Sequence, residues 1–487
     1  MTSHKVHTLS QFAARMALSG ALAALAGCAV GPDYARPTLD VPGAFPDALD
    51  AAAQAPAIAP QWWTLYGDSV LDELVAAALQ RNADARLAAA RIEETNANLR
   101  EAGAAFLPEI DGGLVGSRAR VSAGTAFPNP PPLIRNDVRL ALSTSFELDF
   151  WGRLRRAQEA VRAQALASRY GREVVGLTLE GLVTQAYFSL RSLDAQLVLT
   201  RRTLATRQDS LEVVRARAAA GLVSDLDVNL AIGSVADAQV QRKDLQRQRD
   251  LVEHQLATLT GRLDQRIAAR ASGSAGLPDA PAFPAPGLPS ALLERRPDVR
   301  QAELALVSTN AQIGVAKAAY FPTIALTGVE GGESRALASV LQNSGRIWSV
   351  GLNAVGPLLD WGRTAARVSA AEARSAQAVA GYQRAVETAF REVADAITSL
   401  REATDVQNDL QDRVTAARNS LELVGIRYRA GYSAYIEVLD AQRTANDAEL
   451  ALARNRLTLL NASVDLMRSL GGGWSEADLQ RPPQSSR

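Results

Sequence analysis

The stretch VRLALSTSFELDFWGR, residues 138–153, decides the fold, because a strand pattern ends in it and a helix pattern begins. From Val138 to Phe150, apolar residues and one threonine occupy every second position, and mostly polar or small residues lie between them. This period of two predicts a β-strand with one apolar face. At about 3.3 Å per residue the strand would reach roughly 43 Å, enough to cross a bilayer at a tilt. The same alternation suits a soluble antiparallel sheet with one wet face, so the pattern alone does not establish a membrane strand.

A long helical pattern follows this strand. Residues 151–219 contain no proline and are rich in Ala, Leu, Gln, Glu and Arg, which are strong helix formers. At 1.5 Å per residue such a helix would be about 104 Å long, far beyond a globular helix. The turn AGLVSD at 220–225 then leads into a return helix of about 37 residues, and a helix over 70–105 precedes the strands. The two shorter helices together match the long one, as a palisade of antiparallel helices requires; a free coiled-coil rod is the alternative.

The whole pattern occurs twice. TNANLREAGAAFLP at 95–108 aligns with TNAQIGVAKAAYFP at 309–322, and WGR at 151–153 returns at 361–363. We therefore expect a second long helix over 361–429, followed by the turn AGYSAY and a second return helix. The residues that indicate the other three strands are Ile110, Leu114, Ile324, Leu326, Trp348, Val350, Leu352 and Ala354. Two copies of one unit, rather than two unrelated domains, make up this mixed α and β chain.

These patterns divide the chain into consecutive segments. The segments are a signal peptide (1–27), an N-terminal segment (28–68), a first repeat (69–270) with a β-hairpin at about 108–150, a linker rich in proline and glycine (271–289), a second repeat (290–474) with a β-hairpin at about 322–358, and a C-terminal tail (475–487). Each repeat is expected to contain a helix, the hairpin, a long helix and a return helix.

Four strands per chain cannot form a closed sheet. Open strand edges cannot hydrogen-bond to lipid, and the smallest membrane barrels use about eight strands, so a chain that spans a membrane in this way must oligomerise. Two copies would give eight strands around a lumen filled by side chains, whereas three would give twelve and leave room for water.

The only cysteine of the chain is Cys28, which follows a short apolar run. The residues before it have the parts of a secretory signal, and the run is too short to span a bilayer, which needs about 20 residues. LAGC at 25–28 resembles the lipobox of bacterial lipoproteins, which implies that Cys28 becomes an acylated N-terminus and that Ala29 directs the protein to the outer membrane. An ordinary cleavage site beside an incidental cysteine is the alternative. We expect this covalent lipid and no other cofactor.

The composition argues against several classes of function. The chain has 52 Lys and Arg against 52 Asp and Glu, without the basic surplus that nucleic-acid binding requires. Behind the signal, His254 is the only histidine, so no metal site of the nitrogen and sulfur kind can be completed. Phosphate-binding loops, GxSxG turns and HExxH helices do not occur in the sequence. We therefore expect no enzyme, no metal site and no nucleic-acid partner.

Seven stretches of the sequence, in order, resemble one family. They are CAVGPDYARP (28–37), WWTLYGDSVLDELV (62–75), GLPSALLERRPDVRQAE (287–303), AAYFPTIALTG (318–328), LLDWGR (358–363), YRAGYSAYIEVLDAQR (428–443) and LGGGW (470–474). The chain is similar to the TolC-like outer-membrane factors of RND-type tripartite efflux pumps, in their lipoprotein (OprM/NodT-type) branch. The resemblance implies a homotrimer with a twelve-stranded β-barrel in the outer membrane, continued by a periplasmic α-helical barrel. It also implies a passive exit duct for drugs or other small solutes, which an inner-membrane transporter delivers through a periplasmic adaptor protein.

The same resemblance implies two sites near the helix ends. The turns after the long helices would dock on the adaptor through Gly221, Leu222, Ser224, Gly431 and Ser433. The periplasmic gate would consist of Ile436, Glu437 and Asp440, of Tyr428 and Arg443 as bracing residues, and of Asp227 as the first-copy counterpart of Glu437.

The spacing of two of these carboxylates carries its own argument. Glu437 and Asp440 are three residues apart and share one helix face, so a trimer would bring six carboxylates around one axis, where they would attract cations. The alternative for Glu437 and Asp440 is an ordinary solvated helix face without a function. The alternative for Gly221 and Gly431 is that these glycines only form the turns.

Two other functions fit the same sequence. A TolC-like channel for protein secretion would share the fold, and a non-channel periplasmic structural lipoprotein would share the lipid anchor. The exported substrates are not encoded in such a duct, because it accepts whatever the pump delivers.

Overall fold

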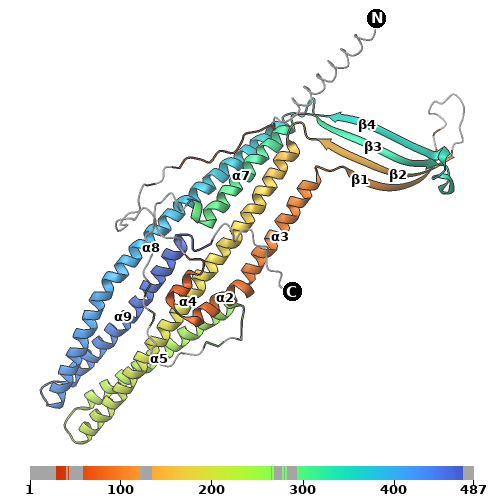
Figure 1. Cartoon of the computed structure of the whole chain (residues 1–487). Coiled ribbons are helices and arrows are strands. Elements are labelled where there is room, and N and C mark those ends of the chain that lie inside the picture. The colour runs from red at the N-terminus through yellow and green to blue at the C-terminus, as the bar shows by residue number, and fades with distance from the viewer. Residues whose placement is uncertain are drawn as a thin grey trace. The chain divides into compact units, whose positions relative to one another are not determined.

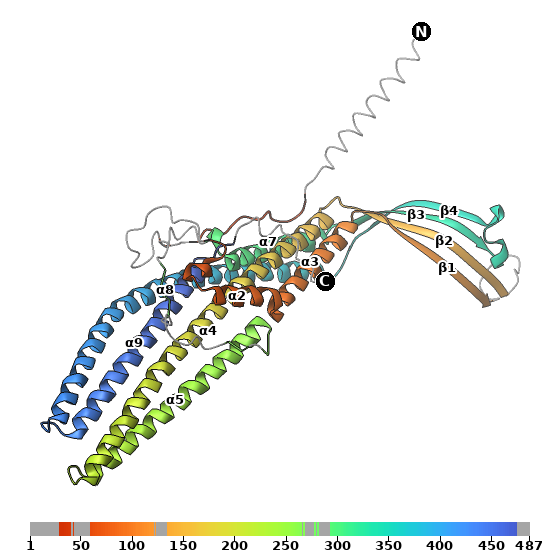
Figure 2. The same ribbon diagram turned by 60° about the horizontal axis from the view of Figure 1, so that its bottom comes forward.

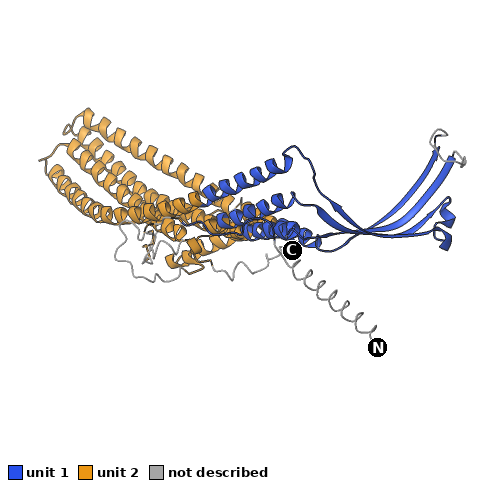
Figure 3. Ribbon diagram, turned by 90° about the horizontal axis from the view of Figure 1, so that it is seen from above, with its two compact units in different colours: residues 1–38, 92–168, 302–382 blue, residues 39–91, 169–301, 383–487 orange. Residues whose placement is uncertain are grey.

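The computed structural model describes residues 29–39, 42, 59–120, 122, 134–264, 266–267, 277–278, 280–281 and 293–474. The expected signal peptide, Cys28, most of the linker and the tail lie outside these residues. The chain forms two compact units, each assembled from three separate segments (Figure 3). Unit 1 comprises Met1–Thr38, Ile92–Ser168 and Ala302–Tyr382, and unit 2 comprises Leu39–Arg91, Arg169–Gln301 and Gln383–Arg487.

Unit 1 contains an antiparallel sheet of four strands in the order β1-β2-β3-β4 (Figures 1 and 2). The strands are β1 (Glu109–Arg120), β2 (Ile134–Leu148), β3 (Thr323–Ser334) and β4 (Arg346–Val355). The two expected hairpins are therefore confirmed. The central pair, β2 with β3, joins the second strand of the first copy to the first strand of the second copy.

The register of the sheet sorts the side chains into an apolar and a polar face. Leu140 lies opposite Leu114 on one side and Gly332 on the other, and Leu326 lies opposite Leu352. Directly opposed residues of antiparallel strands share a face, so all even-numbered residues point to the same side. The large apolar residues of that face are Ile110, Leu114, Val138, Leu140, Leu142, Phe146, Leu148, Ile324, Leu326, Trp348, Val350 and Leu352. The register thus confirms the alternation expected from the sequence.

Two helices of 67 residues each follow the hairpins, α4 (Arg153–Ala219) and α8 (Arg363–Arg429). They begin two residues later than expected, because Trp-Gly forms a turn before each of them. Gly152 and Gly362 have φ of 76° and 83°, a left-handed conformation that glycine adopts readily. Asp149 and Asp360 then accept hydrogen bonds from backbone N–H groups at the two helix starts, at 2.8–3.0 Å. These carboxylates cap the exposed N–H groups that each helix start leaves unpaired.

The shorter helices are α5 (Asp225–Thr260) and α9 (Tyr435–Ser469), which return from the long ones, and α2 (Ser69–Arg81), α3 (Ala83–Ala104) and α7 (Pro297–Ala318), which precede the strands. The expected single helix over 70–105 is in fact two. The break is Asn82, whose ψ of 141° is extended. Its side chain accepts a hydrogen bond from Asp84 N at 2.7 Å and donates one to Leu259 O at 3.0 Å. None of the helices in the described part of the chain is long and apolar enough to cross a membrane.

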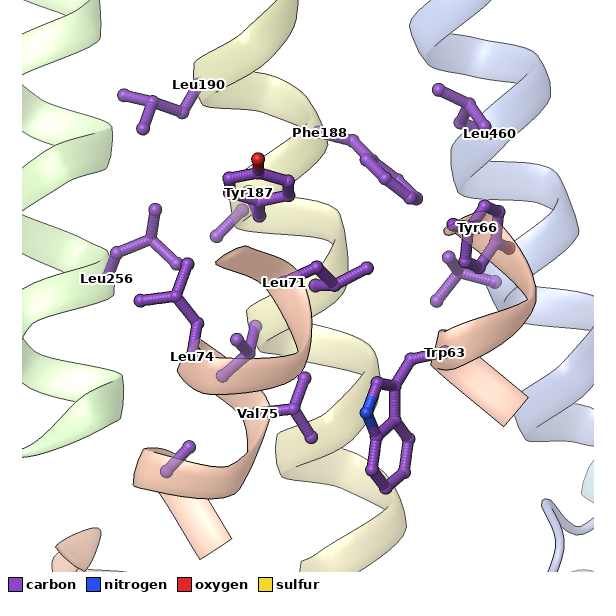
Figure 4. Packing of buried hydrophobic residues seen from close by; sticks show 14 of the residues in the cluster. Trp63, Tyr66, Leu71, Leu74, Val75, Tyr187, Phe188, Leu190, Leu256 and Leu460 are labelled. Atoms are coloured by element: carbon purple, nitrogen blue, oxygen red, sulfur yellow. The ribbon is translucent and has the colours of Figure 1, made fainter. Parts of the chain in front are cut away.

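The core of unit 2 is built around the segment that precedes α2, the short 3-10 helix η1 (Trp62–Tyr66). Figure 4 shows this segment and α2 packed among helices α4, α5 and α9. Two buried hydroxyl contacts fix the arrangement: Tyr187 donates to Asp68 at 2.7 Å, and Tyr66 and Ser463 are 2.6 Å apart. The members of the cluster with no exposed surface are Trp62, Leu71, Val75, Ala78, Val183, Phe188, Leu190, Leu256, Leu460 and Val464.

In unit 1, the segment that follows Cys28 is tied to α7. Arg36 forms a two-pronged ion pair with Glu303, at 2.6 and 2.9 Å. The backbone carbonyl of Pro32 accepts a hydrogen bond from Asn310 at 3.0 Å. A Cβ atom at Gly31 would lie only 2.5 Å from the backbone of the α7 residue Gly314, so the close approach requires glycine. The N-terminal segment is therefore held by charge, hydrogen bonds and close packing.

A buried carboxyl in unit 2 generates a prediction about pH. Burial raises the pKa of Glu180 to about 8, although the indole N–H of Trp62 donates to its carboxylate at 3.0 Å. A carboxyl whose pKa is raised on folding supports the folded state fully at low pH, and this contribution is lost as the pH rises from about 4.5 to about 8. Glu180→Gln keeps a hydrogen-bond acceptor but cannot ionise. We expect the variant to melt above the wild-type protein at pH 8, with a smaller difference at pH 5.

Thermal unfolding followed by circular dichroism at both pH values measures this difference. Glu212→Gln is the matched control, since the Glu212 side chain lies on the same helix and is 72% exposed. It should change the melting temperature equally at both pH values. An equal effect of Glu180→Gln at both pH values would contradict the prediction.

Candidate functional site

The turns that join α4 to α5 and α8 to α9 are built alike. Gly221 and Gly431 have φ of 71° and 83°. The following residues, Leu222 and Tyr432, each donate a backbone hydrogen bond of 2.9 Å to the carbonyl five positions earlier. This is the Schellman ending of a helix, in which a left-handed glycine lets the last carbonyls find partners. A Cβ atom at either glycine would meet nothing within 4 Å, so the backbone angle and not crowding demands glycine here.

Both return helices start with the same kind of cap. The Asp227 carboxylate accepts hydrogen bonds from the backbone N–H and hydroxyl of Ser224, at 3.2 and 3.1 Å. The Glu437 carboxylate accepts from Ala434 N at 3.2 Å and from the Ser433 hydroxyl at 3.1 Å. Asp227 and Glu437 are thus counterparts in space as in sequence. Each satisfies N–H groups at a helix start, where the helix dipole also favours negative charge.

Large apolar side chains stand exposed on both turns. Leu222 is 73% exposed and Tyr432 is 79% exposed, and Leu226 and Ile436 in the first turns of the return helices are also exposed. Isolated exposed apolar residues are ordinary, but this group gathers at the ends of two helix pairs. Gly221, Leu222, Ser224, Gly431 and Ser433, named from the sequence, all lie on these turns. Tyr432 and Leu226 were not among the docking residues expected from the sequence, although neighbouring residues were.

A hydrophobic cluster joins the two helix pairs close to these turns, within unit 2. Its buried residues are Leu211, Val214, Ala231 and Val235 from α4 and α5, and Tyr435 and Val438 from α9. Tyr428 packs against it with its ring 5.6 Å from that of Tyr435, and the Arg217 guanidinium lies 4.8 Å from the centre of the Tyr428 ring. The Tyr428 hydroxyl is buried without a hydrogen-bond partner among the described residues. The Tyr428 ring thus contacts Arg217 of the first helix pair and Tyr435 of the second, close to the two turns.

Three of the other gate residues named from the sequence line a separate groove of about 640 Å³ between α8 and α9. Ile436, Glu437 and Asp440 line it together with Arg413. Asp440 forms an ion pair with Arg443 at 2.7 Å, and both side chains are about two-thirds exposed. An exposed pair of this kind is worth about 0–1 kcal/mol, so it leaves the carboxylate available to other cations.

The structure thus brings three of the named gate residues together, with Arg443 next to them, and places Tyr428 in the cluster between the helix pairs. Asp227 lies on the first turn as the counterpart of Glu437. Sequence reasoning missed Arg217 and Tyr435. Tyr435 could have been found by aligning the two turns, because it is an aromatic residue at the position where the first copy has Asp225. No cluster of His, Cys, Asp and Glu within the described ranges is able to hold a metal ion.

Comparison with known proteins identifies the wider group. The family model described as "Outer membrane efflux protein" matches residues 74–262 and 288–472, one match for each copy of the repeat. The toluene efflux pump outer membrane protein TtgF of Pseudomonas putida is 34% identical over 94% of this chain and 96% of its own. The cation efflux system protein CusC of Escherichia coli is 32% identical over 93% of this chain and 97% of its own. The solved structure of the outer-membrane channel OprN is 29% identical, with a TM-score of 0.85 over 92% of this chain and all of that one.

The cap of α9 generates a prediction that distinguishes the hydrogen bonds of the Glu437 side chain from its negative charge. Glu437→Ala removes the acceptor for Ala434 N and should cost about 1 kcal/mol of stability through fraying of the first turn. Glu437→Gln loses the charge, but glutamine occupies the same place in a capping box and should keep most of the stability. Denaturant unfolding gives the free energies, and hydrogen exchange of the amides at 434–438 locates the loss.

The first copy supplies the matched pair. Asp227→Ala should show the same loss at Ser224, and Asp227→Asn should retain more of the stability. If Glu437→Ala and Glu437→Gln unfold with equal free energies, the carboxylate is not acting as a cap.

Proposed function

We infer the function of this chain from the family to which it belongs, the outer membrane efflux proteins: it is the outer-membrane channel of an efflux pump and extends into the periplasm. It is a channel component and not an enzyme. The observation that carries this conclusion is the twofold match of the family model, which covers both copies of the repeat with their strands and long helices. As part of an efflux pump, the chain works with pump partners.

The working form is a homotrimer. Each chain supplies four strands whose large apolar residues lie mostly on one face, which also carries the Glu330–Arg346 ion pair, and the sheet ends at β1 and β4 among the described residues. Three copies supply twelve strands, which close into a barrel with a water-filled lumen and leave no edge to lipid. The long helices would continue this barrel as a periplasmic helical barrel.

The anchor is a lipid on Cys28. The support comes from the residues directly after it, since Cys28 itself lies outside the described residues. Val30 N donates to the backbone carbonyl of Trp151 at 3.0 Å, and a Cβ atom at Gly152 would lie only 2.7 Å from the Ala29 side chain. The residue next to Cys28 is thus held at the turn where β2 ends. Acyl chains on Cys28 would enter the bilayer beside the strands, in the periplasmic leaflet of the outer membrane.

The cargo is drugs or other small solutes, delivered by an inner-membrane transporter of the RND type through a periplasmic adaptor. Relatives of nearly equal identity are named for toluene efflux and for cation efflux. Chains so similar with such different cargo favour a passive duct whose pump selects the substrate. A role in protein secretion remains the alternative within this fold.

The two helix turns are the docking surface for the adaptor. A partner would cover their exposed apolar side chains, Leu222 and Tyr432, together with the turn residues Gly221, Ser224, Gly431 and Ser433. The gate lies next to it, at Ile436, Glu437 and Asp440, where the trimer axis would collect carboxylates from three copies. Tyr428 and Arg443 brace it.

Complementation of a strain that lacks the chain tests both the efflux function and the docking surface. Restoring the wild-type gene should restore resistance to toxic small solutes. Gly431→Trp should abolish this rescue while trimer yield stays normal, because the bulk stands on the docking surface. Gly431→Asn is the matched control, since asparagine tolerates the left-handed angle, and it should rescue. Rescue by Gly431→Trp would move docking elsewhere, and wild-type resistance without the chain would refute an efflux role in favour of secretion or tethering.

Conductance of the purified trimer in planar bilayers tests the gate. We expect the wild-type channel to conduct poorly and to prefer cations, because the entrance carboxylates attract them. Asp440→Ala combined with Tyr428→Phe should raise conductance and weaken block by multivalent cations. Tyr428→Phe alone should not lower the unfolding free energy, because the lost hydroxyl is buried and has no hydrogen-bond partner among the described residues. Unchanged conductance and selectivity in the double variant would place the gate elsewhere.

A further inference from the structure

In the sheet of unit 1, the pairing of β2 with β3 shows how the unpaired edges of β4 and β1 could pair with each other between two copies of the chain. β1 and β3 are equivalent strands of the two copies, and both their first and their last residues are 214 positions apart. β2 and β4 are equivalent as well, and the WGR turns and long helices that follow them are 210 positions apart. The central pair, β2 with β3, is therefore a contact between the two copies of the repeat.

That central contact includes an aromatic lock at its base. The indole of Trp151, just after β2, stacks on the ring of Phe321, just before β3, with centroids 4.5 Å apart and planes 20° apart. Its N–H also donates to the carbonyl of Pro322 at 2.8 Å. Nearby, Leu148 pairs with Ile324.

Among the described residues, the equivalent positions at the outer edges have no such contact. Trp361, the counterpart of Trp151, is 89% exposed, and Leu358, the counterpart of Leu148, is fully exposed. On the opposite edge, Leu107 stands where Phe321 stands in the second copy, and it is 68% exposed. Trp361 is also the one described non-glycine residue with positive φ, at 55°, a conformation that is rare for a bulky side chain. The counterparts of both lock residues are thus present on the two open edges of the sheet: Trp361 follows β4, and Leu107 precedes β1.

We propose that β4 of one copy pairs with β1 of the next copy in the register that β2 and β3 show within the chain, and that Trp361 locks onto Leu107 and Pro108 of that next copy. This inference rests on the proposed trimer and names its contact. The indole N–H would donate to the Pro108 carbonyl, as that of Trp151 does to Pro322.

The transferred register fixes each pair. Ser143 lies opposite Val329 in the central contact, so Asn353 faces Val115 of the next copy, and Leu358 faces Ile110. Even-numbered residues again oppose even-numbered ones. The large apolar residues thus stay on the same side of the sheet from copy to copy, whereas a slip by one residue would turn those of one copy to the opposite side.

The chemistry of the transferred pairs fits this register. On the apolar face, Ala354 meets Leu114, and Trp348 meets Arg120, whose guanidinium would lie over the indole. On the polar face, Gly351 meets Ser117, which repeats the small pair of Ala141 with Gly331 in the central contact. In that template a Cβ atom at Gly331 would lie 2.3 Å from the backbone of β2, so the crossing requires glycine on one strand. Gly351 supplies it at the edge.

Cysteine crosslinking in the purified full chain reads the register directly. Asn353→Cys combined with Val115→Cys places two thiols opposite each other on the polar face, within the range that a disulfide spans. Mild oxidation should convert most of the protein into covalently linked oligomers. Asn353→Cys combined with Ala119→Cys is the matched control, because its thiols are about 13 Å out of register, and it should stay uncrosslinked. The single variants show any disulfide that involves Cys28.

Native mass spectrometry in mild detergent tests the trimer separately from the strand register. Trimers that crosslink through the control pair, or through neither pair, would overturn the register and leave the trimer standing. Absence of any oligomer would overturn the trimer itself.

Variants of the lock provide the second readout. Trp361→Ala should lower the temperature at which trimers dissociate in detergent, and Trp361→Phe should recover part of the loss, because it restores apolar contact without the N–H donor. Leu107→Ala should also weaken the trimer, and the double variant should lose little more than Trp361→Ala alone, because the partners act as one contact. Fully additive losses, or a Trp361→Ala trimer as stable as wild type, would overturn the lock.

Discussion

Backbone hydrogen bonding at strand edges is the constraint on which the rest of the molecule depends. An N–H or C=O group left unpaired in hydrocarbon costs several kcal/mol, so a strand in a membrane must have neighbours on both sides. Within the chain, the pairing of β2 with β3 meets this requirement and joins the two copies of the repeat. The outer edges of β1 and β4 have no neighbouring strand among the described residues. Four amphipathic strands therefore favour the proposed oligomer, in which other copies of the chain supply those neighbours.

The duplication repeats each local solution, and the two copies differ at a few positions near the helix turns. Both helix turns use a left-handed glycine, and both return helices use an acidic cap, Asp227 or Glu437. Asp440 has no acidic counterpart, since Leu230 occupies the equivalent position. Tyr428 and Tyr435 likewise replace Ala218 and Asp225 of the first copy. The second copy therefore carries both the extra carboxylate and the aromatic bracing.

The N-terminal segment before the first repeat is held by specific polar contacts as well as by packing. Arg36 pairs with Glu303 in unit 1, and Asp68 receives the Tyr187 hydroxyl in unit 2. Buried or half-buried groups of this kind stabilise the fold only while each has its partner, so they select one arrangement of the segments.

Local pattern in the sequence determined the strands, the long helices, their turns and the duplication. A period of two, the absence of proline over 151–219 and a glycine after each long helix depend only on neighbouring residues, and the observed ends at Ala219 and Arg429 match them. Caps and turns decided the later helix starts at Arg153 and Arg363, which helix propensity alone does not reveal.

Tertiary structure decided the rest. The break at Asn82 depends in part on a carbonyl of α5, the burial of Glu180 depends on η1, and the bracing of Tyr428 depends on Arg217. Each of these contacts joins residues far apart along the chain, and periodicity carries no information about such partners. For the same physical reason the alternation in β4 revealed an apolar face but not which strand would lie beside it: that choice depends on the register, which only the paired backbones define.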